Sequence, residues 1–127
     1  MHVLLVEDSL EVAEVSKAML EYLGFEVSLA HRGDIGLQCI LHQRPALVIT
    51  DFMMPVMSGL EMIGRARDAQ YAGGIILCSA MPELELPVHR ASYNLFLQKP
   101  YRLTTLASVM AAAQSCIIAS GTESSAN

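Results

Sequence analysis

The chain has 127 residues, a length that suits a single domain. Apolar residues make up 53% of the sequence and charged residues 17%, which excludes a chain that stays unfolded over most of its length. The net charge is −5 and the eight basic residues are scattered singly. We therefore expect no direct binding to nucleic acid, which requires basic side chains gathered on one face.

The N-terminus and the cysteines indicate a cytoplasmic protein. The sequence begins MHVLLVED, without the basic start and long apolar run of a secretory signal. No stretch reaches the roughly 18 uninterrupted apolar residues that cross a bilayer, so no membrane partner is expected. Cys39, Cys78 and Cys116 are odd in number and form no C-x-x-C pair, which favours reduced thiols over disulfides or zinc binding.

Short apolar runs alternate with helical patterns along the first half of the chain. Val3 to Val6 predicts a buried strand, and Ser9 is a suitable cap for a helix that ends at Gly24. The positions of this helix expected to face the core are Val12, Val15, Met19 and Tyr22, with Leu23 alongside. Further strands are expected over residues 25–30 and 46–50, with a helix over 34–42 between them.

The same alternation continues in the second half. A helix opens at Ser58, a fourth buried strand ends at Ser79, a short fifth strand covers residues 95–97, and a long helix starts at Leu103. The positions expected to face the core are Leu60, Ile63 and Ala66 in the first of these helices and Leu106, Met110, Ala113 and Ile117 in the last. From Ser120 the chain is small and polar, and we expect it to be frayed.

The segment from Pro82 to Asn94 is not expected to form one continuous helix. An interior proline removes a backbone hydrogen bond and clashes with the preceding turn, whereas a proline is tolerated as the first residue of a helix. We therefore predict an irregular loop followed by a shortened fourth helix of about two turns, from Pro87 to Tyr93.

Strands that alternate with helices predict an α/β fold, in which a parallel sheet is covered by helices on both sides. We assign residues 1–119 to one domain and residues 120–127 to a disordered polar tail. In such sheets the ligand site lies beyond the carboxyl ends of the strands. Polar residues stand at four of these ends: Glu7 and Asp8 after the first strand, Asp51 after the third, Ser79 after the fourth and Lys99 after the fifth.

Each of these residues also has an ordinary explanation as a helix cap, a turn residue or a surface charge. Together, however, they place three carboxylates in one pocket, where two charges ~4 Å apart repel by roughly 4 kcal/mol at an effective dielectric of 20. A hard divalent cation relieves this repulsion, and oxygen ligands favour magnesium or calcium over zinc. We expect Mg²⁺ (or Mn²⁺) to be held by Glu7, Asp8 and Asp51, because magnesium also accepts a phosphoryl oxygen as a ligand.

Phosphoryl transfer depends mostly on positioning and charge neutralisation, and this pocket offers both. Asp51 is the expected nucleophile and would become an acyl phosphate. Lys99 would neutralise one phosphoryl oxygen and the cation another. The Ser79 hydroxyl would serve the third oxygen, together with backbone N–H groups in the loops after Asp51 and Ser79, those of Met53 and Ala80.

These residues resemble the response-regulator receiver family of two-component signalling. The resemblance runs from Val3 to about Ile118 and consists of Glu7-Asp8, Asp51 followed by MMPVMSG, Ser79-Ala80 and Lys99-Pro100, in the order and at nearly the spacings of that family. It implies a flavodoxin-like, three-layer α/β/α fold with a doubly wound five-stranded parallel sheet. It also implies that residues 1–119 form the receiver domain and that the backbone carbonyl of Met53 is a further metal ligand.

The resemblance implies a function as well. A receiver accepts a phosphoryl group from the phosphohistidine of a histidine kinase or a histidine phosphotransfer protein, in a two-component system or phosphorelay. It is not an enzyme beyond catalysing its own phosphorylation and dephosphorylation. Ser79 and Phe96 occupy the positions of the hydroxyl and the aromatic ring that switch on phosphorylation, although Phe96 also suits a permanently buried core position.

The last helix has no charged residue between Arg102 and Glu123. Small residues on a helix let a partner approach closely, so we expect this helix to dock an output partner or to mediate self-association. A plain alanine-rich surface helix is the alternative interpretation.

Three other functions fit the chain less well. A haloacid-dehalogenase-type phosphatase needs a second acid two residues after the nucleophile, where this chain has Met53. A flavodoxin-like flavin carrier needs a phosphate-binding loop after the first strand, where Glu7 and Asp8 would repel a phosphate. A degenerate receiver that acts as an unphosphorylated adaptor stays open, although the full set of acidic, hydroxyl and ammonium side chains favours phosphorylation.

Overall fold

The structure, a computed structural model, describes residues 1–87 and 93–125. Its strands are β1 (His2–Val6), β2 (Glu26–Ala30), β3 (Leu47–Asp51), β4 (Gly74–Ser79) and β5 (Leu95–Gln98), and its helices are α1 (Leu10–Tyr22), α2 (Gly33–Gln43), α3 (Gly59–Asp68) and α4 (Leu103–Ser125). The strands form one parallel sheet in the order β2-β1-β3-β4-β5. The predicted α/β fold with a doubly wound five-stranded sheet is therefore confirmed.

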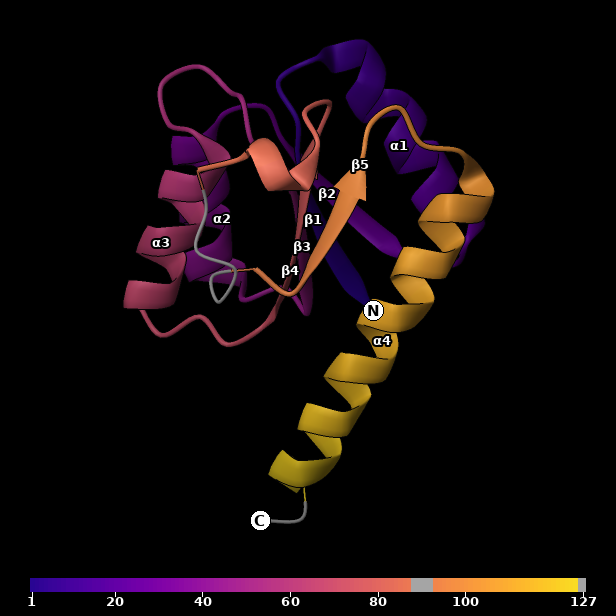
Figure 1. The fold of residues 1–127 in the computed structure, drawn as a ribbon. Coiled ribbons are helices and arrows are strands. Elements are labelled where there is room, and N and C mark those ends of the chain that lie inside the picture. The colour runs from indigo at the N-terminus through magenta and orange to yellow at the C-terminus, as the bar shows by residue number, and fades with distance from the viewer. Residues whose placement is uncertain (88–92, 126–127) are drawn as a thin grey trace.

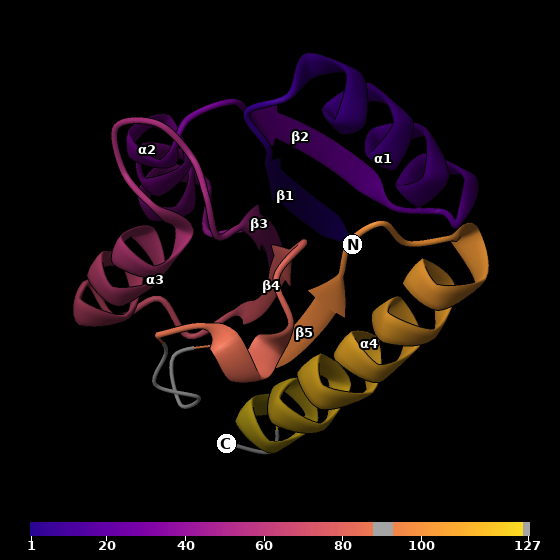
Figure 2. The ribbon, with the colours of Figure 1, turned by 45° about the horizontal axis from the view of Figure 1, so that its top comes forward.

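Helices cover both faces of this sheet, α2 and α3 on one side and α1 and α4 on the other (Figures 1 and 2). Side chains on a strand point alternately to the two faces. In β1, Leu4 and Val6 pack into the α2/α3-side core, whereas Val3 and Leu5 pack into the α1/α4-side core. Strands buried on both faces explain why β1, β3 and β4 read as continuous apolar runs.

The ends of the helices follow the chemistry expected of caps. The Ser9 hydroxyl accepts a hydrogen bond from the Val12 N–H at 3.3 Å, which satisfies one unpaired donor of the first turn of α1. Gly24 follows the end of α1 with a φ of 98°, a left-handed conformation that glycine adopts without steric cost.

The face of α1 that packs on the sheet differs in part from the predicted one. Its buried residues are Ala13, Ser16 and Leu20, whereas Val15 is 61% exposed and Tyr22 79% exposed. The prediction was wrong for Val12, Val15 and Tyr22, whereas Met19 and Leu23 are partly buried against the core as expected. The side of the helix that meets the sheet carries the small Ala13 and Ser16 together with the fully buried Leu20.

The connection between β4 and β5 also differs in part from the prediction. A short 3₁₀ turn, η1 (Glu83–Glu85), follows Pro82 where we expected an irregular loop. The two-turn helix predicted from Pro87 to Tyr93 falls on residues 88–92, which lie outside the described residues. On either side of that gap, Leu86 and Tyr93 are buried in the α2/α3-side core and anchor the connection.

The last helix packs on the sheet as predicted at Leu106, Met110 and Ala113, which are buried. The side chain of Ile117, the fourth predicted core position, lies outside the part of the chain whose burial the structure describes. It continues to Ser125, past the expected start of the polar tail, since no proline interrupts it. Its C-terminal turns extend beyond the sheet (Figure 1). The division of the chain at residue 119 stays a prediction.

Candidate functional site

The loops after β1, β3, β4 and β5 meet at the carboxyl edge of the sheet. They line a cavity of about 290 Å³, here called the acidic pocket. Its lining includes all five residues expected to share one site: Glu7, Asp8, Asp51, Ser79 and Lys99. The parallel arrangement of the strands brings these side chains together, because every carboxyl end lies at the same edge.

The loop after β3 depends on a close approach between α3 and the strand that carries Asp51. The Gly59 N–H donates to the Phe52 carbonyl at 2.8 Å, and a Cβ at this position would overlap the Asp51 carbonyl oxygen. Ser58 caps α3 by accepting from the Glu61 N–H at 3.2 Å. Only glycine allows the helix to start this close to the strand, which explains the Ser58-Gly59 pair after the loop.

The three carboxylates form a group suited to a cation. One oxygen each of Glu7, Asp8 and Asp51 lies within 4.8 Å of the other two. The side chains of Glu7 and Asp51 are only 5% and 8% exposed, whereas Asp8 is open to solvent. An all-oxygen set with one solvent-facing ligand fits Mg²⁺, which retains part of its hydration shell when bound to protein.

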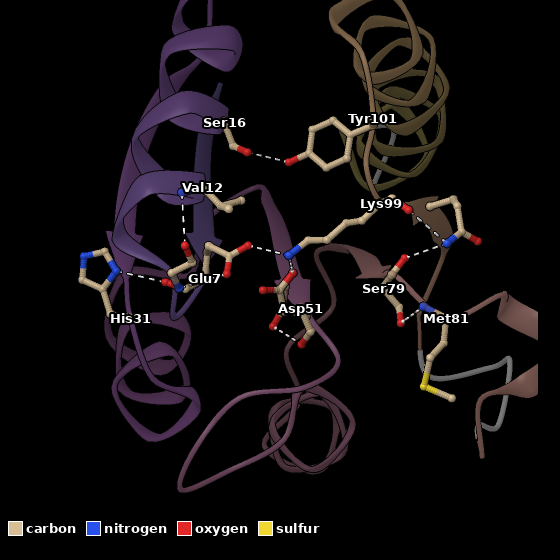
Figure 3. A network of polar contacts seen from close by, with 12 residues as sticks. Glu7, Val12, Ser16, His31, Asp51, Ser79, Met81, Lys99 and Tyr101 are labelled. Atoms are coloured by element: carbon tan, nitrogen blue, oxygen red, sulfur yellow. Dashed lines mark hydrogen bonds and ion pairs between the residues drawn. The ribbon is translucent and has the colours of Figure 1, made fainter.

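Lys99 lies between the two buried acids. Its ammonium Nζ is 2.7 Å from Glu7 Oε1 and 2.6 Å from Asp51 Oδ1, as Figure 3 shows. The side chain comes from the end of β5, and its peptide bond to Pro100 is cis. One positive charge between two carboxylates offsets part of the repulsion that their burial would otherwise cause.

Proton affinities in the pocket differ sharply between neighbours. Burial raises the pKa of Asp51 to about 8, and its hydrogen bond with Glu7 contributes to the rise. Burial also acts to raise the pKa of Glu7, but hydrogen bonds with Asp51, Lys99 and the Ser9 N–H outweigh it and lower the pKa overall. Burial acts to lower the pKa of Lys99, whereas its hydrogen bonds to both acids raise it overall. The two buried acids therefore differ in proton affinity although both contact the same ammonium group.

Ser79 lines the pocket, and its hydroxyl forms a hydrogen bond within the loop that follows β4. The hydroxyl oxygen accepts a hydrogen bond from the Met81 N–H at 3.0 Å (Figure 3). The Ser79 carbonyl accepts from the Lys99 N–H at 2.8 Å, which continues the pairing of β4 with β5. A further donor to this carbonyl, the Gln98 side chain, was missed in the sequence, where it carried no signal beyond its place before Lys99.

The remaining predicted site residues lie around the pocket. Met53 and Ala80 are exposed and belong to its lining. Phe96 is partly buried against the α2/α3-side core and borders a separate cavity, also about 290 Å³, with Glu83 and Tyr93. Its side chain is thus neither fully buried nor fully exposed, and its role as a switch stays a prediction.

A second groove, of about 500 Å³, runs between α1 and the loop after β5; we call it the α1 groove. Val12 and Val15 contribute apolar surface to it, and it shares Val12, Ala80 and Lys99 with the acidic pocket. A hydrogen bond of 2.6 Å joins the Ser16 and Tyr101 hydroxyls across it (Figure 3). This surface was not predicted from the sequence, because Val12 and Val15 were expected to face the core.

Comparisons with known proteins agree on a family. The family model described as "Response regulator receiver domain" matches residues 3–111. The chain is 33% identical over 107 residues to the uncharacterized transcriptional regulatory protein YkoG of Bacillus subtilis, covering 83% of this chain and 47% of YkoG. It is 32% identical over 111 residues to the sensor histidine kinase AtsR of Burkholderia thailandensis, covering 84% of this chain and 18% of AtsR.

Solved structures show the same fold. The response regulator protein TrrA of Thermotoga maritima, solved in complex with Mg(2+)-BeF, superposes with a TM-score of 0.81 at 26% identity, covering 88% of this chain and 97% of TrrA. The chain spans about half or less of the length of YkoG and AtsR. Across residues 1–87 and 93–125, none of the helices combines the length and the apolar character needed to cross a membrane.

Proposed function

Since this chain belongs to the response regulator receiver family, a family of signalling domains, we propose that it takes up a phosphoryl group on Asp51. The observation that carries the proposal is the position of the Lys99 ammonium between Glu7 and Asp51, two acids that form a close group with Asp8. These groups supply a nucleophile, a fixed cation and a set of metal ligands within one pocket. Transfer of a phosphoryl group requires that combination.

The acids of the pocket would hold Mg²⁺ or Mn²⁺, with the Met53 backbone carbonyl as a further ligand. A bound divalent cation supplies positive charge to a phosphoryl oxygen. Asp51 acts as a ligand and as a nucleophile in its ionised form, which the positive charge of Lys99 favours and a bound cation would favour further. Glu7, already ionised at neutral pH, and the solvent-facing Asp8 complete the oxygen set.

The proposed reaction transfers a phosphoryl group from a phosphohistidine to Asp51. An Asp51 carboxylate oxygen forms the new P–O bond, the P–N bond to the histidine breaks, and the histidine nitrogen keeps the electron pair. Lys99 neutralises one phosphoryl oxygen, while the Ser79 hydroxyl and the N–H groups of Met53 and Ala80 donate hydrogen bonds to the others. The Ser79 hydroxyl accepts from the Met81 N–H, which leaves its own hydrogen free to donate to a phosphoryl oxygen.

The donor protein, a histidine kinase or a histidine phosphotransfer protein, must reach a residue at the bottom of the acidic pocket. The apolar surface that borders this pocket is the α1 groove, so we propose that the donor docks there. The part of α4 that precedes Glu123 carries no charged residue, and its surface is proposed for an output partner or for self-association.

Val15→Asp tests the proposed docking surface. Val15 is 61% exposed and lies outside the acidic pocket, so the variant should fold and take up phosphoryl groups from acetyl phosphate at the wild-type rate. A panel of purified histidine kinases is first tested for the one that phosphorylates the wild type fastest. The rate of phosphoryl transfer from this kinase to the variant should be at least tenfold lower, because a charge in an apolar contact must be desolvated. An unchanged transfer rate would remove the α1 groove from the donor interface.

Met53→Asn tests how the pocket entrance controls the lifetime of the acyl phosphate. Met53 is 69% exposed at the rim, where an apolar side chain offers no hydrogen bond to an attacking water. An asparagine amide can position that water, so the phosphorylated form should decay several times faster, as followed by ³²P loss after desalting. Equal decay rates for both proteins would refute a role for this side chain.

The proposed function is tested by incubating the chain with acetyl phosphate and Mg²⁺ and measuring its intact mass. We expect an increase of one phosphoryl group that EDTA prevents. A mass that never changes would favour the alternative of an unphosphorylated adaptor.

A further inference from the structure

The backbone carbonyl of Glu7 is held by a side chain from the end of the neighbouring strand. His31 follows β2, and its ring nitrogen Nδ1 lies 2.9 Å from the Glu7 carbonyl oxygen, as Figure 3 shows. A carbonyl oxygen can only accept a hydrogen bond, so Nδ1 carries the hydrogen that His31 donates. The imidazole of His31 therefore ties the end of β2 to the turn that carries Glu7 and Asp8.

The strand register explains why His31 reaches this carbonyl. Val6 pairs with Ala30 at the end of the parallel β1–β2 ladder, and the Glu7 N–H donates to the Ala30 carbonyl at 2.9 Å. One residue further along each strand, the same register sets His31 opposite Glu7. The His31 ring thus continues the link between the two strand ends by one hydrogen bond, into the turn after β1.

The peptide group that His31 holds joins two of the proposed metal ligands, Glu7 and Asp8. A peptide group is planar, so holding the Glu7 carbonyl oxygen also restricts the direction in which the chain leads to the Asp8 Cα. The Glu7 side chain is held separately, because Oε1 accepts from Lys99 at 2.7 Å and Oε2 from the Ser9 N–H at 3.1 Å. Asp8 is exposed, so the direction of its carboxylate depends more on this backbone than on packing.

We propose that His31 is a positioning residue for the divalent cation and acts through the peptide group between Glu7 and Asp8. The inference rests on the proposed function, because it assumes that these acids hold Mg²⁺. His31 favours the backbone arrangement in which one oxygen each of Glu7, Asp8 and Asp51 lies within 4.8 Å of the other two. Water can replace the ring as a hydrogen-bond donor to the carbonyl, but a mobile water does not fix its direction.

The test measures the binding of Mg²⁺ to the metal-free full chain by isothermal titration calorimetry. His31→Phe keeps an aromatic ring and removes the donor, and His31→Ala removes the ring as a second variant. His31→Asn places an amide N–H near the position of Nδ1 and should restore most of the affinity. His42→Phe, in an exposed position of the last turn of α2, is the matched control and should bind Mg²⁺ as the wild type does.

The Kd for Mg²⁺ should rise about tenfold in His31→Phe and His31→Ala, the lower end of the range for groups that orient metal ligands, because His31 holds a ligand's backbone. The Mg²⁺ concentration for half-maximal uptake from acetyl phosphate should rise by the same factor, whereas the rate at saturating Mg²⁺ should fall much less.

Two results would overturn the inference. One is an unchanged Mg²⁺ affinity in His31→Phe and His31→Ala, and the other is a loss of affinity in His31→Asn as large as in His31→Ala. If the wild type itself bound no Mg²⁺, the proposed function would fail and the inference with it.

Discussion

Asp51→Asn is expected to abolish phosphoryl uptake from acetyl phosphate, with a rate below about one hundredth of the wild-type rate. An amide is a far weaker nucleophile than a carboxylate, and nucleophilic catalysis contributes at least this much in comparable sites. The other acids of the pocket do not replace Asp51, because Glu7 is held by Lys99 and Asp8 lies at the solvent-facing side. Intact mass spectrometry over a time course measures the rate.

Two variants serve as controls for this experiment. Asp8→Asn removes a proposed metal ligand and keeps the acceptor, so uptake should slow at low Mg²⁺ and recover as Mg²⁺ is raised. Asp68→Asn changes an exposed acid at the end of α3 and should leave the rate unchanged. Continued incorporation into Asp51→Asn at the wild-type rate would mean that another residue is the acceptor.

Lys99→Met is expected to lower the free energy of unfolding of the metal-free chain by about 3 kcal/mol at pH 7. Removing one partner of a buried ion pair leaves its counter-charge uncompensated, and here two acids lose their partner. The pKa of Lys99 is raised in the folded chain, so its contribution is fully present below the ordinary value of 10.5 and is lost only as the pH rises through the higher folded value. Urea unfolding with EDTA, at pH 7 and therefore within this window, measures the loss.

A double-mutant cycle separates the loss of charge compensation from a non-specific loss of folding stability. Asp51→Asn in the Lys99→Met background should recover about half of the lost stability, because it removes one of the two stranded acids. Arg65→Met breaks an exposed ion pair with Glu61 and should cost less than about 1 kcal/mol. Strictly additive effects of the Lys99 and Asp51 substitutions would show that the two side chains are not coupled.

The parts of the site that depend on topology were predictable from the sequence. Parallel strands must place their carboxyl ends at one edge, so residues after four separate strands were expected to meet. Glu7, Asp51, Ser79 and Lys99 each interrupt or end an apolar run, which made them visible as a set. The cap at Ser58 and the glycine after it were also readable, because both meet local backbone requirements.

The features that depend on side-chain packing were not predictable from the sequence. The side of α1 that meets the sheet carries the small Ala13 and Ser16, and Val15 is left exposed although its side chain is apolar. A pattern of apolar residues along the helix does not show which side this will be. The contact of Gln98 with the Ser79 carbonyl arises from the β4–β5 register and a side-chain conformation, and neither is encoded in a local pattern. The 3₁₀ turn after Pro82 likewise depends on the buried anchors Leu86 and Tyr93.

The most direct test of phosphoryl uptake on Asp51 is a crystal structure of the chain with Mg²⁺ and beryllofluoride, a mimic of the phosphoryl group. We predict beryllium bonded to an Asp51 carboxylate oxygen, a metal ion in contact with Asp51 and its two neighbouring acids, and Lys99 Nζ within hydrogen-bond distance of a fluorine. The Ser79 hydroxyl should donate a hydrogen bond to the adduct. Beryllofluoride bound away from Asp51, or an adduct that Lys99 does not contact, would contradict the assignment of this pocket to phosphoryl transfer.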